Sequence, residues 1–267
     1  MKKLPIYQVD AFADTVFKGN PAAIVPLKED WLPDELMQKI AAENNLAETA
    51  YIIQRDGHYD IRWFTPAVEV DLCGHATLAS AHIVLNMFHV KAKQVKFHSQ
   101  RSGVLTVTKD KDQLILDFPT DTLTRVDLPE ALVQGLGIVP VETYKGKTDY
   151  MLVFENQEQI EKLEPNFNWI AKVDARGIIV TAPGKDKEID FVSRFFAPQS
   201  GINEDPVTGS AHTTLVPYWA EKLDKTDLTG HQISPRGGTL YCKYLGDRVK
   251  LGGKSALYLK GEILLED

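Results

Sequence analysis

The sequence predicts an α+β protein made of two similar domains, and two observations lead to this prediction. First, short alternating apolar segments typical of strands follow one another along most of the 267 residues, while helical spacing occurs in only a few places. Second, the same order of short motifs occurs twice, at an offset close to half the chain. In each half a glycine, Gly74 or Gly209, is followed by a helical run of small and apolar residues.

The first half reads as strands interrupted by two helices. Alternation of apolar and polar residues predicts a strand over residues 4–12. Apolar residues at helical spacing predict a helix that begins at Pro33 and ends near residue 42. The Asp56-Gly57 pair predicts a hairpin turn between strands at 48–53 and 59–64. The Gly74 junction and its helix follow, and the half closes with further strands at 95–97, 103–108 and 114–118.

The second half repeats this plan after residues 119–129, which are rich in Thr, Asp and Pro and are typical of a linker. A short helix is expected over 130–136. The expected strands are 150–154, 177–182, 191–197, 239–244, 248–251 and 256–265, with the Gly209 junction between the third and the fourth. We therefore expect domains at 1–119 and 120–267, with the C-terminal strand near 257–267 as a segment that could join the first domain instead.

Three pairs of motifs support the duplication. They keep their order and an almost constant offset: Arg62 with Arg194 (132 residues), Gly74 with Gly209 (135) and Arg101 with Arg236 (135). Two such domains facing each other would hold a ligand between two helix N-termini, both of which favour negative charge. The sequence thus predicts a cleft for a small carboxylated metabolite.

Composition excludes several other classes of function. The formal net charge of −7 disfavours nucleic acid or an anionic membrane surface as a partner. Two cysteines without a Cys-x-x-Cys pair indicate a reducing compartment, and the N-terminus lacks the apolar core of a signal peptide. No apolar run approaches the ~18 residues of a membrane span. We expect a cytoplasmic protein.

Four polar residues are candidates for chemistry. Glu48 opens an apolar strand, where partial desolvation would raise a carboxyl pKa toward that of a general base, although a solvated loop glutamate is the simpler alternative. His75 follows the first glycine and is either a proton shuttle or a polar helix start. Asp205 is a second carboxylate or an ordinary turn aspartate, and Ser210 a ligand-binding hydroxyl or a helix cap.

Other familiar sites fit less well. Thr208 and His212 stand where a nucleophile elbow needs glycines. Asp71, Cys73 and His75 alternate like metal ligands on one strand, but no spaced partner pair accompanies them, so no metal is expected. The Gly252-Gly253 pair lacks the strand–GxGxxG–helix context of a dinucleotide site, and no cofactor is expected.

Four motifs together resemble the phenazine-biosynthesis PhzF family of isomerases. They are GNPAAIV (19–25), NNLAETAY (44–51), CGHATLASAH (73–82) and EDPVTGSAH (204–212), in the family's order. The resemblance runs from the first strand to the last and implies the diaminopimelate epimerase-like fold. That fold has two pseudo-symmetric domains, each a β-sheet barrel wrapped around a central helix, with the site in the cleft between them. A homodimer is common in the family and is an expected state here.

The resemblance also implies residue roles. The glutamate of the ETA motif, Glu48, would be the acid/base, with His75 and Asp205 as the other catalytic groups. Gly74, Gly209, Ser210 and Cys73 would line the substrate-binding site. The expected activity is a cofactor-independent isomerisation that moves a proton on a small carboxylated metabolite.

Relatives within the same fold leave an alternative open. Diaminopimelate epimerases and proline racemases use two cysteines, each beside a glycine at a domain junction; Cys73 and Thr208 stand in those places here. A threonine hydroxyl is too weak a base without a partner, so one-sided chemistry by Glu48 fits better. A two-base amino-acid or imino-acid racemase using Cys73, and a non-catalytic small-molecule-binding protein, remain as alternatives.

Overall fold

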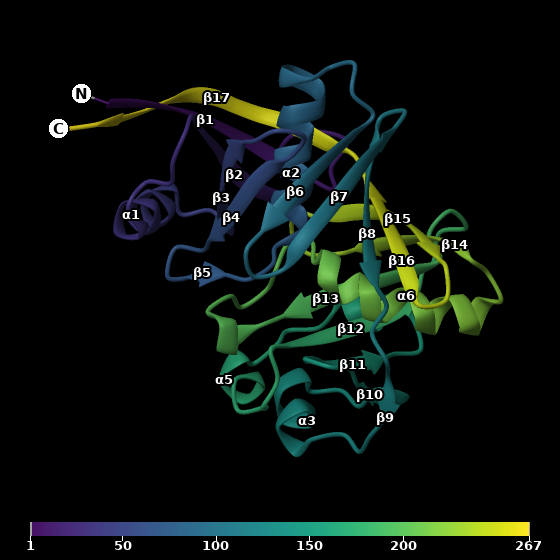
Figure 1. The fold of residues 1–267 in the computed structure, drawn as a ribbon. Helices are drawn as coiled ribbons and strands as arrows, with labels where there is room; N and C mark the ends of the chain where they lie inside the picture. The colour runs from purple at the N-terminus through teal and green to yellow at the C-terminus, as the bar shows by residue number, and fades with distance from the viewer. Residues whose placement is uncertain (1, 267) are drawn as a thin grey trace. The chain divides into compact units, whose positions relative to one another are not determined.

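The computed structural model describes residues 2–266 and divides into two compact units (Figure 1). Unit 1 comprises Met1–Asp117 and Gly252–Asp267, and unit 2 comprises Phe118–Leu251. The C-terminal strand β17 (Ser255–Leu265) belongs to unit 1 because it pairs antiparallel with β1 (Lys2–Ala11) along the whole of β1. The second domain is therefore shorter than the expected range 120–267, and the first is built from both ends of the chain.

Unit 1 contains a mixed sheet in the order β17-β1-β2-β3-β4-β6-β7-β8, with the two-residue strand β5 on β4. Its further strands are β2 (Asn20–Leu27), β3 (Glu48–Gln54), β4 (Tyr59–Phe64), β5 (Glu69–Val70), β6 (Gln94–Ser99), β7 (Gly103–Asp110) and β8 (Gln113–Pro119). The expected hairpin joins β3 and β4, and Gly57 supplies the positive φ of 76° that its turn requires. The helices are α1 (Asp34–Asn44), α2 (Gly74–Ile83) and the π-helix η1 (Val84–Phe88).

Unit 2 contains a sheet in the order β9-β10-β11-β12-β13-β14-β15. Its strands are β9 (Thr124–Arg125), β10 (Glu142–Lys145), β11 (Asp149–Val153), β12 (Gly177–Pro183), β13 (Phe191–Phe196), β14 (Asp227–Gln232) and β15 (Gly238–Tyr244), followed by β16 (Arg248–Gly253). Its helices are α3 (Glu130–Leu136), α4 (Gln157–Glu161), α5 (Phe167–Ile170), the 3-10 helix η2 (Pro198–Ser200) and α6 (Gly209–Leu223).

The two sheets confirm the duplication. From β1 through β2, β3, β4 and β6 to β7, the pairings are antiparallel, parallel, antiparallel, parallel and antiparallel. The series from β10 to β15 has the same directions in the same order. In both units the glycine-initiated helix connects the fourth strand of the series to the fifth, as α2 or α6.

The repeated arginines make the same contacts in both units. Arg62 on β4 holds the carboxylate of Glu69 with Nε and Nη2, and its guanidinium lies 5.1 Å from the Phe64 ring centroid. Arg194 on β13 holds Glu204 with the same two nitrogens and lies 5.0 Å from the Phe196 ring. Each bidentate pair fixes the loop that leads toward the glycine of the following helix.

Helix α2 is the centre of unit 1. It packs against β1, β2, β3, β7 and β17, and of its ten residues all but Gly74 and His82 are buried. Such a helix must satisfy its polar side chains internally, and Thr77 and Ser80 donate to the carbonyls of Cys73 and Ala76. In unit 2, α6 packs against β11, β14 and β15. Each sheet is thus wrapped around one helix, and among residues 2–266 no helix is long and apolar enough to span a membrane.

Candidate active site

Glu48 is placed by the end of α1 and the start of β3. Asn45 ends the helix in the left-handed conformation, at φ 47°, and Asn44 donates through Nδ2 to Thr49 Oγ1 across the turn. The chain then enters β3, where Glu48 pairs in register with Ala22 of β2. The carboxylate therefore projects from the first residue of a strand that is buried from Thr49 to Ile53, and its side chain is 13% exposed.

Cys73 and His75 are placed by the start of α2. Cys73 is the extended N-cap residue, and the helix begins at Gly74. The Cys73 carbonyl accepts both the N–H and the hydroxyl of Thr77, which fixes the first helical turn. Because His75 is the second helical residue, its imidazole lies at the start of the helix.

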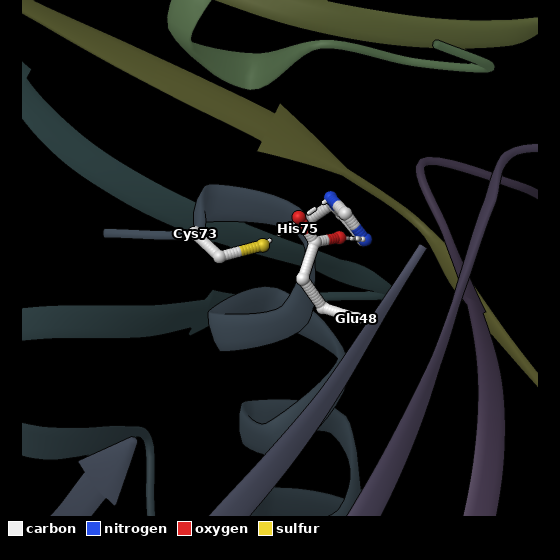
Figure 2. A group of neighbouring side chains, drawn as sticks. All are labelled: Glu48, Cys73 and His75. Carbon is white, nitrogen blue, oxygen red and sulfur yellow. Dashed lines mark hydrogen bonds and ion pairs between the residues drawn. The ribbon is translucent and has the colours of Figure 1, made fainter. Parts of the chain in front are cut away.

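The three side chains meet at the imidazole of His75 (Figure 2). Cys73 Sγ lies 3.5 Å from Nδ1 of His75, and Glu48 Oε2 lies 3.1 Å from Nε2. The Glu48–His75 contact has the distance of an ion pair but not the alignment of a hydrogen bond, and both atoms are buried without another hydrogen-bond partner among the described residues. Buried polar atoms left in this state are uncommon in folded proteins, and they mark this pair as a candidate for a functional role.

The electrostatics of this cluster favour a carboxylate–imidazolium pair. Burial by itself would lower the pKa of His75, but the negative charges available at Cys73 and Glu48 outweigh it, so this pKa is raised well above its ordinary value. Burial raises the pKa of the Cys73 thiol to about 11, and the charge of Glu48 adds to the effect. The thiol is therefore a weak acid in this cluster, and the charge of Glu48 raises the pKa values of both Cys73 and His75.

The N-termini of α2 and α6 differ from those of other helices in the chain. Neither helix has an acidic residue in its first turn, and neither Cys73 nor Thr208 caps its helix with a side-chain hydrogen bond. By contrast, α1 and α3 both carry acidic residues in their first turns. The first N–H groups of a helix have no acceptor within it, and the helix dipole favours a negative charge beside them.

The second predicted group lies in unit 2 at the start of α6. Thr208 is its N-cap residue and donates its hydroxyl to Asp205 Oδ2. Gln232 at the end of β14 accepts the Thr208 N–H at 2.9 Å and donates to the Asp205 carbonyl at 2.7 Å. Gln232 therefore orients both residues. Sequence reasoning missed this role because β14 is polar and was not expected as a strand.

Ser210 has a partner that the sequence did not indicate. Arg176, the residue before β12, donates through Nη1 to Ser210 Oγ at 2.9 Å, and its other nitrogens bind the buried carboxylate of Asp149. The contact of Ser210 with Arg176 corresponds to the contact of His75 with Glu48 in unit 1, because Ser210 and His75 both follow the first glycine of their helices. In unit 1 the start of β3 brings a carboxylate to that position, whereas in unit 2 the start of β12 brings a guanidinium.

The structure also revises the set of candidate metal ligands. Asp71 does not join Cys73 and His75, because its carboxylate is exposed and pairs with Arg101 at 2.9 Å. Glu48 takes its place, and the donor atoms of Glu48, Cys73 and His75 all lie within 4.8 Å of one another. These three residues could hold a cation, although their charge states near neutral pH suit proton transfer.

Known proteins similar to this chain agree on its family. A sequence profile of the PhzC-PhzF family, described as phenazine biosynthesis-like protein, matches residues 9–261. An uncharacterized isomerase of Pseudomonas aeruginosa is 48% identical over 263 residues, which cover 98% of this chain and 100% of the relative. An uncharacterized isomerase of Halalkalibacterium halodurans is 46% identical over 268 residues, which cover 99% of this chain and 100% of the relative.

Solved structures confirm the fold. A PhzF family protein from Enterococcus faecalis matches with a TM-score of 0.94 and 46% identity, covering 99% of this chain and 100% of that one. A hydroxyproline epimerase from Agrobacterium vitis, at a TM-score of 0.62 and 9% identity, shares the fold alone, over 99% of this chain and 93% of that one. The duplicated α+β architecture, the profile match and the close relatives together show that this chain belongs to the PhzC-PhzF family of phenazine biosynthesis-like proteins.

Proposed function

We propose that this isomerase moves a proton within a small carboxylated metabolite, with Glu48 as the general base and without a cofactor. The observation that carries the proposal is the buried pair of Glu48 and His75, 3.1 Å apart, at the uncapped N-terminus of α2. A glutamate at this position can reach a substrate that docks its carboxylate at the start of the helix, where the helix dipole favours negative charge.

The steps follow from the charge states of the two groups. Glu48 as carboxylate takes a proton from a carbon beside an unsaturated or carboxyl-bearing group, which breaks one C–H bond and leaves an enolate-like anion. The His75 imidazolium and the N–H groups at Gly74 and His75 stabilise that developing charge. Glu48 then returns the proton to another carbon of the same molecule, so the product is an isomer and no atoms are gained or lost.

The group in unit 2 supplies a second set of polar contacts in this proposal. Asp205, Ser210 and the backbone of Gly209 are expected to bind and orient the substrate, as the family resemblance implies. The positive charge of Arg176 beside Ser210 supports a role in holding an anion rather than in removing a proton. We accordingly propose that proton abstraction depends on unit 1 alone.

A deuterium-exchange screen tests the proposal. Carboxylated metabolites are incubated in D₂O with the wild-type chain, and NMR or mass spectrometry detects incorporation of deuterium from solvent. Glu48→Gln is expected to abolish exchange into any substrate that the wild type labels. Glu43→Gln, an exposed glutamate on α1, is the matched control and should exchange like the wild type. Full exchange by Glu48→Gln would refute the assignment.

The same screen separates the remaining alternatives. A two-base racemase that uses Cys73 would lose exchange in Cys73→Ala, but the buried, protonated thiol leads us to expect that this variant retains it. A binding protein without turnover would be protected from thermal unfolding by one of the metabolites and would exchange none of them.

A further inference from the structure

Three metal-ligating side chains lie together in unit 1, in a cluster separate from the Glu48 site. His58 and Asp60 are two residues apart where β4 begins, so their side chains share one face of the strand. His98 lies on β6, which pairs in parallel with β4, and it stands in register with Asp60. The sheet itself therefore brings two imidazoles and a carboxylate to the same place.

The distances between these side chains match those between ligands of a bound metal ion. His58 Nε2 lies 3.2 Å from Asp60 Oδ1, and His98 Nδ1 lies 3.6 Å from the same oxygen. All three donor atoms are within 4.8 Å of one another. Zinc bonds of about 2.0–2.2 Å at tetrahedral angles place neighbouring ligand atoms about 3.4 Å apart. A cation could thus enter the cluster with small side-chain movements.

Two of the three side chains, His58 and Asp60, have outer contacts of the kind that orient metal ligands. Nδ1 of His58 contacts the Asp56 carbonyl at 3.2 Å, which favours the tautomer that leaves Nε2 free to bind a metal. Arg55 donates through Nε to Asp60 Oδ2 at 2.8 Å, so Oδ1 is the oxygen that faces the imidazoles. The guanidinium also opposes a cation electrostatically, which sets an upper limit on affinity.

The cluster is accessible from solvent. The side chains of His58, Asp60 and His98 are 36%, 22% and 47% exposed. A metal ion could enter from solvent, and water could complete its coordination. Two imidazoles and one carboxylate suit late first-row divalent cations rather than calcium or magnesium, which prefer oxygen ligands.

We propose that His58, Asp60 and His98 form a binding site for a late first-row divalent cation such as Zn²⁺. The bound ion would tie β4 to β6, whose pairing is confined to two residue pairs, Tyr59 with Phe97 and Asp60 with His98. The site would stabilise unit 1 and is independent of the proposed catalytic function.

Cobalt titration tests this site and distinguishes it from the Glu48 cluster. Co²⁺ added to the wild-type chain is expected to give visible d–d absorption that saturates, without the sulfur-to-cobalt charge-transfer band that binding at Cys73 would produce. His58→Ala and His98→Ala should each weaken Co²⁺ binding at least tenfold. His89→Ala, which removes another exposed histidine of unit 1, is the matched control and should bind like the wild type.

A second measurement keeps the test independent of absorption. Zn²⁺ is expected to raise the midpoint of thermal unfolding of the wild type and of His89→Ala, but not of His98→Ala. Circular dichroism checks that the metal-free variants are folded. Equal binding and equal stabilisation in the wild type and His98→Ala would overturn the proposal. A saturating charge-transfer band that disappears in Cys73→Ser would then place the metal in the Glu48 cluster instead.

Discussion

Replacing Glu48 by glutamine is expected to lower the pKa of His75 sharply. Burial disfavours the charged imidazolium, whereas Cys73 and Glu48 both favour it. Glu48→Gln removes one of these two groups. Burial also raises the pKa of the remaining Cys73 thiol to about 11, so the thiol compensates poorly for the lost carboxylate and the pKa of His75 falls.

The separation of the two charges gives the size of the effect. Glu48 Oε2 and His75 Nε2 are 3.1 Å apart. Two unit charges at this distance attract each other by about 5 kcal/mol at an effective dielectric constant of about 20. Both charges are delocalised over several atoms, which increases their mean separation and weakens this attraction. Its loss in Glu48→Gln is expected to lower the pKa of His75 enough for a titration to detect.

NMR titration of the imidazole Cε1–H resonances measures this pKa without a substrate, and His75→Gln identifies the resonance. His82 and His212 are internal controls, because burial lowers the pKa of each to about 4 and neither contacts Glu48. Their titrations should not change in Glu48→Gln. A His75 pKa that stays within half a unit of the wild-type value would refute the electrostatic account of the pair.

The same pair makes stability depend on pH in a defined direction. Because the folded-state pKa of His75 is raised, its contribution to stability is fully present below the unfolded-state pKa of about 6.5. It is lost as the pH rises through the folded-state pKa. Urea unfolding at several pH values should show this decline in the wild type and not in His75→Gln.

Two further predictions concern other parts of the molecule. Glu204→Gln leaves the charge of Arg194, a side chain that is only 12% exposed, without its partner, and it should cost about 3–5 kcal/mol of unfolding free energy. Glu262→Gln, at the exposed pair with Lys3, is the control and should cost less than about 1 kcal/mol. Equal losses in urea unfolding would contradict this reasoning. Burial and Glu48 raise the pKa of Cys73 to about 11, so its thiol should react with iodoacetamide at pH 8 roughly two hundred times more slowly than a free cysteine. Mass spectrometry of the Cys73 peptide follows this reaction. A rate like that of free cysteine would show that the thiol is not buried as described.

Much of the fold could be predicted because its signals are local. Alternation located the strands around Glu48 and Tyr59, and the Asp56-Gly57 pair located their hairpin. The repeated motifs revealed the two units because the chain uses the same arginine and glycine in both. The sequence left the domain of β17 undecided, because the residues of a strand do not show which strand it pairs with. Its partner β1 lies at the opposite end of the chain.

The parts of the candidate site that were missed depend on contacts across the fold. Gln232 lies on β14, whose one large apolar side chain, Leu228, gives no apolar alternation. Its strand conformation comes from pairing with β13 and β15. Arg176 belongs to no motif and meets Ser210, 34 residues later, only because β12 and α6 are folded together. Neither residue type is unusual, so composition and spacing carried no signal for them.

The comparison of the two units explains why proton transfer should be one-sided. Both units build an uncapped helix N-terminus and place a polar side chain after the first glycine, His75 or Ser210. In unit 1 that side chain meets a carboxylate, which can accept a proton. In unit 2 it meets Arg176, whose guanidinium stays protonated and cannot act as a base under physiological conditions. The proposed isomerisation, in which Glu48 removes and returns the proton, accords with this difference between the two units.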